Sequence, residues 1–238
     1  MRIRFSALSV ILVPLSLLAA PSESETRATL RSLNTLGTVE SAAAHGITGF
    51  RLGAGVTSFA VPEASQATFA QDTGYTGPEG RVLFPKLQVT KGLWYPFDLG
   101  LVYGQLQHSD ISQLGGYLQW TLYEGLAQPA FALRGTYSRI QGLQTGALES
   151  GGLYAVTSWG VPFVTLFASY GAVQTRGTPL PVTEANAEPT SQTWWQPEAS
   201  VGVNLTILPP FVVLGVEATS LLNTGSKPIL QAKLSIGL

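Results

Sequence analysis

The tripeptide His108-Ser109-Asp110 contains the three residue types of a hydrolytic triad. Neighbouring residues on an extended chain point to opposite faces, so a consecutive His and Ser cannot easily form the hydrogen bond between base and nucleophile. Three acids expected near the same end, Asp72, Glu149 and Glu184, are scattered along the chain. The tripeptide is therefore interpreted as a polar turn, and the chain is not expected to be an enzyme.

Other chemical sites have equally little support. The chain has no cysteine and two histidines, His45 and His108, so neither a metal site nor a cofactor is predicted, and His45 has no identifiable partner. The stretch Gly53-Ala54-Gly55 lacks the strand-then-helix setting of a phosphate loop and is interpreted as strand glycine at a crowded inner face. A glycosylation sequon at 204–206 lies in a predicted strand and is discounted.

Composition indicates the solvent in which these residues are held. Of 238 residues, 45% are hydrophobic but only 11% are charged, where a soluble domain has about 25% charged residues. The formal net charge is −1 and no basic run occurs, which argues against a nucleic-acid surface. Mean hydropathy is +0.23. The balance is that of a membrane protein, provided that membrane segments can be found.

Residues 1–20 have the layout of a secretory signal peptide. Arg2 and Arg4 precede an apolar run from Phe5 to Ala20, which is followed by small residues. The run is shorter than the roughly 20 residues that a transmembrane helix needs. We therefore predict that the protein is exported and that residues 1–20 are removed, with Ser22 as an alternative cleavage position.

Apolar residues further along the chain alternate with polar ones, a period of two that is typical of strands with one apolar face. Each predicted strand is about as long as the 9–11 residues that a tilted strand needs to cross a bilayer. The predicted strands are residues 50–61, 83–94, 97–106, 111–123, 129–140, 151–160, 163–173, 195–207, 211–221 and 229–238. The pattern predicts an all-β fold, a closed up-and-down antiparallel transmembrane barrel of about ten strands spanning residues 49–238.

The connections between these strands are predicted to alternate strictly between short and long. Short ones fall at 95–96, 124–128, 161–162 and 208–210, and longer ones at 62–81, 107–110, 141–150, 174–193 and 223–227. Transmembrane barrels sort their loops in this way, and an even number of strands places both ends of the chain on the side of the short turns.

Aromatic residues are expected to form girdles at the two membrane interfaces, where amphipathic rings are favoured. The girdle residues predicted are Trp94, Tyr95, Trp120, Tyr123, Trp159, Phe163, Trp194, Trp195 and Phe211.

Charged residues on the opposite face of the strands are expected to line the lumen. They are Arg51, Lys86, Asp98, Arg134, Glu198, Glu217 and Lys233. Glu217 and Lys233 fall nearly opposite each other across the last hairpin. Two interpretations stay open: ion pairs that keep a narrow barrel rigid, or a polar pathway for small solutes. About ten strands lies near the closed end of the range of barrel sizes.

Residues 21–48 precede the barrel and form an N-terminal segment of their own. Leu30, Leu33, Leu36 and Val39 recur at a helix-like spacing, and Gly46 is a possible stop. The segment is predicted to be a short periplasmic helix, a plug inside the lumen, or a disordered tether.

The chain resembles Gram-negative outer-membrane β-barrel proteins, in its pattern rather than in a diagnostic motif. The most specific likeness is its end, where Leu234, Ile236 and Leu238 alternate as in the C-terminal assembly signal of such barrels; those proteins most often end in Phe. The resemblance implies an outer-membrane location with both termini in the periplasm. It implies contact with outer-membrane lipid and with the barrel-assembly machinery through the last strand.

Two functions are compatible with this pattern. The first is a non-enzymatic structural or interaction subunit of a cell-envelope assembly, such as secretion, adhesion or gliding-motility machinery. Its extracellular loops 62–81 and 174–193 would bind envelope partners, because long loops on a rigid scaffold commonly carry binding. The alternative is a narrow porin-like channel or transporter for small or apolar solutes.

Overall fold

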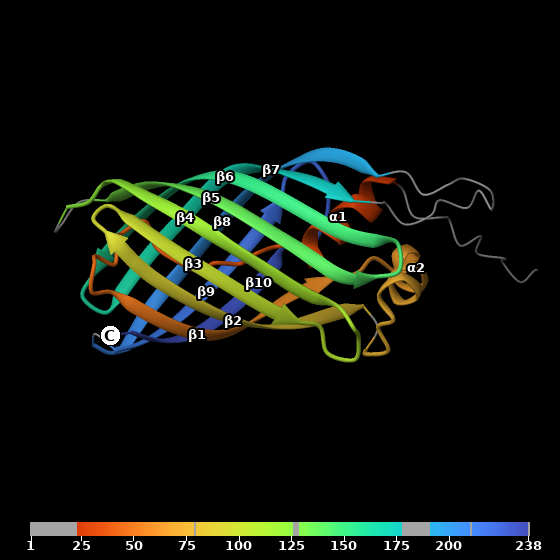
Figure 1. Ribbon diagram of the computed structural model, residues 1–238, viewed down its shortest axis with the longest axis horizontal. Coiled ribbons are helices and arrows are strands. Elements are labelled where there is room, and N and C mark those ends of the chain that lie inside the picture. The colour runs from red at the N-terminus through yellow and green to blue at the C-terminus, as the bar shows by residue number, and fades with distance from the viewer. Residues whose placement is uncertain (1–22, 79, 126–128, 178–190, 210, 238) are drawn as a thin grey trace, which may run out of the picture.

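The computed structural model is a closed barrel of ten antiparallel strands, in which β1 pairs with β10 and every other strand pairs with its sequence neighbours (Figure 1). The structure describes residues 23–237 except 79, 126–128, 178–190 and 210, so the signal peptide expected at 1–20 lies outside the described residues. The strands are β1 (Phe50–Ala60), β2 (Arg81–Trp94), β3 (Phe97–Gln105), β4 (Ser112–Tyr123), β5 (Ala130–Leu143), β6 (Gly146–Val161), β7 (Val164–Gly177), β8 (Gln192–Leu208), β9 (Val212–Leu221) and β10 (Ile229–Gly237). The predicted up-and-down barrel is confirmed.

Alternation along the strands separates an apolar outer face from a polar inner face. On β3, Leu99, Leu101 and Tyr103 are exposed, whereas Asp98 and Val102 between them are buried. Leu101 is 56% exposed, which would be unfavourable in water but suits a surface that faces lipid. The outer face is that of a transmembrane barrel.

The two ends of the barrel differ in their connections. Tight turns join β2 to β3, β6 to β7 and β8 to β9 at what we call the short-turn end. At the opposite, long-loop end, residues 61–80, 106–111 and 222–228 connect strands. The longer connection expected over 141–150 is wrong: β5 continues to Leu143 and β6 begins at Gly146. Gly142 and Gly146 adopt positive φ there (92° and 113°), which permits a tight turn in place of a loop.

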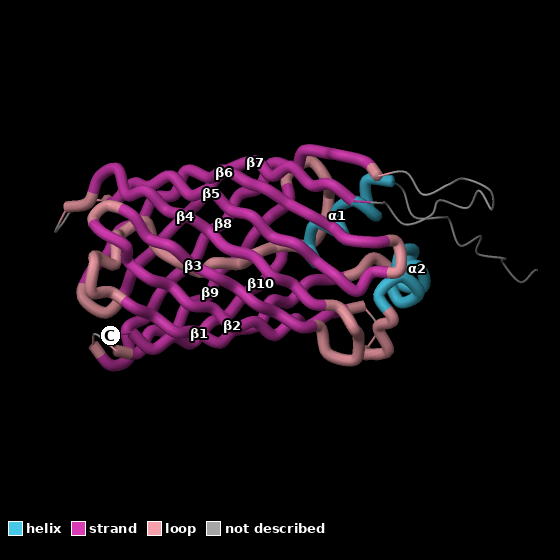
Figure 2. Tube along the Cα trace, viewed as in Figure 1, coloured by secondary structure: helices cyan, strands magenta, loops and turns pink. Residues whose placement is uncertain are grey.

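Two helices lie at the long-loop end (Figure 2). Helix α1 (Glu23–Leu33) precedes the barrel, and α2 (Glu63–Thr73) occupies the connection between β1 and β2, which had been expected to be a loop. α2 begins after Pro62 and ends at Gly74, whose φ of 62° is the left-handed conformation common after a helix. Within the described residues, neither helix has the length and apolar character needed to cross a membrane.

The largest apolar core lies at the long-loop end of the lumen rather than midway along it. Leu30 and Leu33 of α1 pack there with Phe69 of α2 and with the inner faces of the strand ends, including Phe59 and Phe84. Both leucines are at most 1% exposed. This core holds α1 at the long-loop end, and two smaller apolar clusters lie further along the lumen.

The described chain begins and ends at opposite ends of the barrel (Figure 1). Arg27 of α1 donates to Gln192 at the start of β8, at the long-loop end (3.0 Å). The amide of Gly237 donates to the carbonyl of Phe211, at the short-turn end (2.7 Å). The expectation that both termini lie on one side is therefore wrong for the described residues, because the N-terminal segment passes along the lumen before β1.

Candidate functional site in the barrel lumen

The N-terminal segment runs through the lumen from the long-loop end to the short-turn end. Just beyond α1, Asn34 donates to Ser150 of β6 (2.7 Å). Further along, the Ala42 amide donates to the Ser158 hydroxyl (3.1 Å), and the Ala44 amide donates to Glu124 beyond the end of β4 (3.2 Å). Of the three placements that the sequence left open for this segment, these contacts correspond to the one inside the barrel. The helical part stops at Leu33, so the spacing of Leu36 and Val39 is not helical.

Glycines on the strands leave room for this segment. A Cβ at Gly115 of β4 would lie 2.5 Å from Leu36 Cδ1, and one at Gly215 of β9 would lie 2.6 Å from Val39 Cγ1. Gly37 lies between these two contacts with a φ of 65°, and a Cβ there would meet the Gln231 side chain at 1.6 Å. The inward strand glycines are thus a sequence signal for an occupied lumen that the sequence reasoning missed.

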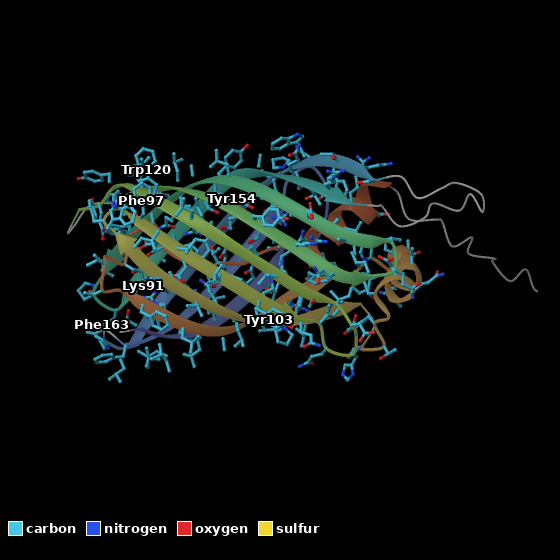
Figure 3. The ribbon with its side chains drawn as sticks, in the orientation of Figure 1. Lys91, Phe97, Tyr103, Trp120, Tyr154 and Phe163 are labelled. Carbon is cyan, nitrogen blue, oxygen red and sulfur yellow. The ribbon has the colours of Figure 1, made fainter. Side chains whose placement is uncertain are left out.

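Arg31 of α1 forms the first of two buried ionic clusters with the strands. Its guanidinium pairs with the Glu198 carboxylate of β8 through Nε and, at 2.9 Å, through Nη2. Tyr154 of β6 donates to the same carboxylate (2.8 Å), and Arg31 also donates to the Asn34 carbonyl (2.8 Å). Tyr154 lies about midway along the barrel (Figure 3). The cluster fixes the end of α1 to the wall.

Glu40 forms the second cluster and was not singled out from the sequence. Its carboxylate accepts from Lys233 (2.6 Å), Arg51 (3.1 Å) and Gln88 (3.2 Å), which lie on three neighbouring strands. His45 Nε2 lies 3.7 Å from the same carboxylate. A buried carboxylate is costly unless it is paired and hydrogen-bonded, and here both conditions are met.

The other charged side chains that face the lumen also contact the segment. Lys86 donates to the Thr35 carbonyl, and Glu217 accepts from the Val39 amide (3.0 Å). Arg134 donates to the Thr38 hydroxyl (2.5 Å) and to the Glu40 carbonyl (2.9 Å).

At the short-turn end, Asp98 accepts from the His45 amide (3.1 Å). The expectation that His45 has no partner is therefore wrong. All seven charged residues assigned to the lumen from the sequence thus touch the segment, and six are under 9% exposed, Arg51 being partly buried.

Glu217 and Lys233, expected nearly opposite each other across the last hairpin, are offset by two residues and do not pair. Glu217 is in register with Gln231, and Lys233 with Gly215, so the two charges are offset along the hairpin. Lys233 reaches instead to the Thr38 carbonyl (2.7 Å) and to Glu40. Its stem crosses Gly53, where an added Cβ would lie 3.1 Å from Lys233 Cδ, so this glycine does sit at a crowded inner face.

Little free space remains beside residues 35–39 of the segment, whereas a hollow of about 340 Å³ lies beside α1 at the long-loop end. A cavity of about 40 Å³ lies between Arg31, Thr38, Arg134 and Glu198, and a second of about 10 Å³ lies near Gln88. The larger one has room for a few water molecules at most. In the described residues the lumen is a packed polar interior.

The predicted girdle residues lie on the outer face, with one exception. Phe97, Trp120 and Phe163 all lie at the end of the barrel opposite α2 (Figure 3). Trp194 is 6% exposed and packs in the core beside Arg27, whose Cζ lies 5.8 Å from its ring, because Trp195 takes the outward position on β8. Assigning both tryptophans to the girdle is therefore wrong. The other girdle residues, all exposed, are Trp94, Tyr95, Trp120, Tyr123, Trp159, Phe163, Trp195 and Phe211.

The last strand presents Leu234 and Ile236 outward, 48% and 57% exposed, while Leu238 lies outside the described residues. At the long-loop end, Ser109 donates to the Thr73 carbonyl and accepts from the Ile111 amide (3.2 Å), as a turn residue does. No group of three or more potential metal-ligating side chains occurs in the part of the chain that the structure describes.

Asp72 connects α2 to the turn between β5 and β6 at the long-loop end. Its carboxylate accepts from the Thr145 amide (2.9 Å) and hydroxyl (3.3 Å) in the turn between β5 and β6. Burial raises the pKa of this carboxyl above its ordinary value, and the two hydrogen bonds from Thr145 oppose that rise.

Comparisons with known proteins add similarity of fold only. No family model and no curated protein matches the chain. It is similar to the N-terminal β-barrel domain of OprF from Pseudomonas aeruginosa, with 11% identity, a TM-score of 0.35, and coverage of 81% of this chain and 99% of that one. It is also similar to the Yersinia pestis outer membrane protein Ail, with 11% identity, a TM-score of 0.40, and coverage of 80% of this chain and 99% of that one. The outer membrane protein OprG from Pseudomonas aeruginosa is 8% identical, with a TM-score of 0.38 and coverage of 84% of this chain and 99% of that one.

Proposed function

We propose that the protein is a non-enzymatic outer-membrane barrel whose lumen is closed by its own N-terminal segment and whose long-loop end binds partners. The observation that carries the proposal is the engagement of all seven strand charges by residues 31–45, which leaves a cavity of only about 40 Å³. A barrel whose inward charges are held by its own segment in this way is a rigid scaffold rather than an open pore.

We place the short-turn end in the periplasm and the long-loop end outside the cell, as barrels of this type sort their turns and loops. The C-terminal strand, with Leu234 and Ile236 outward, would then meet the barrel-assembly machinery from the periplasm. Helix α1 would lie at the outer surface.

The binding elements proposed are the connection 62–81, which holds α2, and the connection 174–193, of which 178–190 lie outside the described residues. α2 is anchored from beneath by Phe69 and Asp72 and leaves Ala67 and Gln71 exposed. A rigid support with a free face is suited to contact an envelope protein.

Photo-crosslinking tests the binding role. A photoreactive residue at Gln71 is expected to yield a defined protein adduct in intact cells, whereas one at Leu52, on the lipid face of β1, is expected to yield none. Equal adducts at both positions, or none at Gln71, would count against an interaction surface on α2.

Planar-bilayer recording tests the closed lumen. The full-length protein is expected to show no steady conductance, because the remaining cavities do not form a path. A stable, reproducible open level in the wild-type protein would overturn the proposal that the segment closes the barrel.

A plug-gated channel is the second candidate, and the charged side chains that line the lumen favour it. Arg31 and Glu40 hold the segment by side-chain charges, so Arg31→Ala with Glu40→Ala should release both ionic anchors. Current steps in this variant, absent from an Arg139→Ala/Glu149→Ala control, would support gating. A silent bilayer with correctly folded variant protein would exclude it.

A further inference from the structure

The outer face of the barrel carries a groove over β3, β4, β5 and β6. Its volume is about 940 Å³, and its walls include Leu101 and Tyr103 of β3, Leu114 and Leu118 of β4 and Tyr137 of β5. These five side chains are 47–63% exposed, so the groove opens to the lipid rather than to the lumen. It extends to Ser112 at the start of β4, which places its upper end at the long-loop end of the barrel.

Outward-facing glycines create the floor of the groove. Gly116 is in register with Leu101 and Tyr137, and Gly135 is in register with Leu118 and Leu153. A Cβ at Gly135 would meet no atom within 4 Å, so the space above it is free. The floor is therefore a hollow between larger apolar side chains.

Arg139 lies on the outer face at the long-loop end of the groove, and Arg176 lies on the same face two strands further along the sheet, outside the groove lining. Arg139 lines the groove, and in register across the sheet follow Glu149 of β6 and Arg176 of β7. Arg139 Nη1 lies 3.6 Å from Glu149 Oε1, and Arg176 forms no ion pair with any residue that the structure describes. The row thus holds two positive charges and one negative charge, with the arginines about 10 Å apart across two strand spacings.

We propose that this face binds a membrane lipid with a phosphate headgroup, the phosphate at Arg139 and Arg176 and an acyl chain in the groove. An arginine on a lipid-facing strand is unfavourable at the membrane midplane but is well placed at the interface, where a phosphate oxygen can accept from the guanidinium. The positions along the barrel fit a lipid, since the arginines lie at the long-loop end, where a headgroup would be, and the hollow lies nearer the middle of the membrane, where an acyl chain would be. The inference rests on membrane insertion, not on the state of the lumen.

Native mass spectrometry of the full-length protein in detergent tests the site with three probes. Phosphatidic acid carries both the phosphate and the chains, diacylglycerol carries the chains alone, and inorganic phosphate carries the anion alone. We expect saturable binding of phosphatidic acid, with at least tenfold weaker binding of diacylglycerol and of inorganic phosphate, since each lacks one half of the contact.

Matched variants separate the two halves of the site. Arg139→Gln with Arg176→Gln should weaken phosphatidic acid binding about tenfold, whereas Lys227→Gln, an exposed cation at the same end but on another loop, should not. Gly135→Leu should weaken it by filling the hollow, whereas Ala54→Leu on the lipid face of β1 should not. Heat-modifiable gel mobility confirms that each variant is folded.

Equal binding of phosphatidic acid and diacylglycerol would overturn the lipid site. Unchanged binding of phosphatidic acid in both the Arg139→Gln/Arg176→Gln variant and the Gly135→Leu variant would do the same. Neither result would alter the conductance and crosslinking outcomes, so failure here is distinguishable from failure of the proposed function.

Discussion

Most charged side chains that face the lumen are paired with a segment that is distant from them in sequence. Arg31 and Glu198 are separated by 167 positions, and Glu40 and Lys233 by 193. Such pairs stabilise only as a set, because each partner alone is a buried charge in a poorly hydrated interior. At the scale of single residues, the account therefore predicts that breaking one partner costs more than removing both.

Glu198→Gln is expected to destabilise the barrel by about 3–5 kcal/mol, because it leaves Arg31 buried and uncompensated. Arg31→Gln should do the same, and the double variant should lose clearly less than the sum of the two. The thermal transition from fast to slow gel mobility measures each variant. The exposed pair Arg139–Glu149 is the control, and a double-mutant cycle on it should give a coupling free energy under about 1 kcal/mol. Additive effects of Arg31 and Glu198 would contradict the buried pair.

Asp72 provides a pH-dependent test at the long-loop end. Because its folded pKa is raised by burial, the folded state binds the proton more tightly than the unfolded chain. Its contribution to stability is therefore favourable at low pH and is lost as pH rises through the raised pKa. Asp72→Asn should raise the thermal midpoint slightly at neutral pH, by at most about 3 °C, and the difference should shrink on acidification toward pH ~4. A difference that grows on acidification would show the opposite sign of shift.

The segment and the strands fit against each other because glycines on the strands leave room for side chains of the segment. Gly215 admits Val39, and Gly115 admits Leu36, while α1 is held by the apolar core at the long-loop end. The segment is fixed along its whole path, by packing at one end and by hydrogen bonds in the middle and at the other end.

Gly215→Val should displace the segment while leaving the strand pairing intact, because the atoms that its Cβ meets are the ends of the Val39 and Asn204 side chains. We expect a loss of about 1–3 kcal/mol and faster hydrogen exchange at residues 34–42. Gly135→Val on the outer face, where a Cβ meets nothing, is the matched control. Unchanged exchange in the Gly215 variant would indicate that Val39 does not contact β9.

The molecule as a whole has an apolar outer surface, a polar filled interior and two unlike ends. In the proposed orientation α1 and α2 both lie at the extracellular end. The chain then crosses the membrane region once inside the lumen, as the N-terminal segment, and ten times as strands of the barrel. The chain contains no cysteine, so a single introduced thiol reports one position without background.

Lys227→Cys, in the loop between β9 and β10, is expected to react with a membrane-impermeant maleimide on intact cells. Glu124→Cys, beyond the end of β4, is expected to react only after the outer membrane is permeabilised. The reverse pattern would mean that the short-turn end faces outward and that the proposed orientation is inverted.

Much of the wall could be predicted from the sequence because strand alternation is a local signal. The strand count and most boundaries follow from it, and so do the inward positions of residues such as Asp98 and Arg134. The alternation also contained the correction for Trp194, since two consecutive strand residues cannot both face lipid.

The path of the N-terminal segment could not be predicted in the same way. Several of its contacts join residues 96 to 193 positions apart, and no local pattern specifies them. Glu40 illustrates the difficulty, because a single acid among small residues gives no sign that three strands supply its partners. The turn at 144–145 was missed because it depends on φ values at Gly142 and Gly146, which a polar stretch does not disclose.

A disulfide between the segment and the wall tests the central claim, that residues 31–45 occupy the lumen, most directly. Ala42 and Ser158 lie in contact through the Ala42 amide and the Ser158 hydroxyl (3.1 Å), and the chain has no other thiols. In the folded Ala42→Cys/Ser158→Cys variant, mild oxidation is expected to link the two positions within one chain, detected by mass spectrometry of linked peptides. Two free thiols that both react with maleimide in the oxidised, folded protein would contradict the occupied lumen.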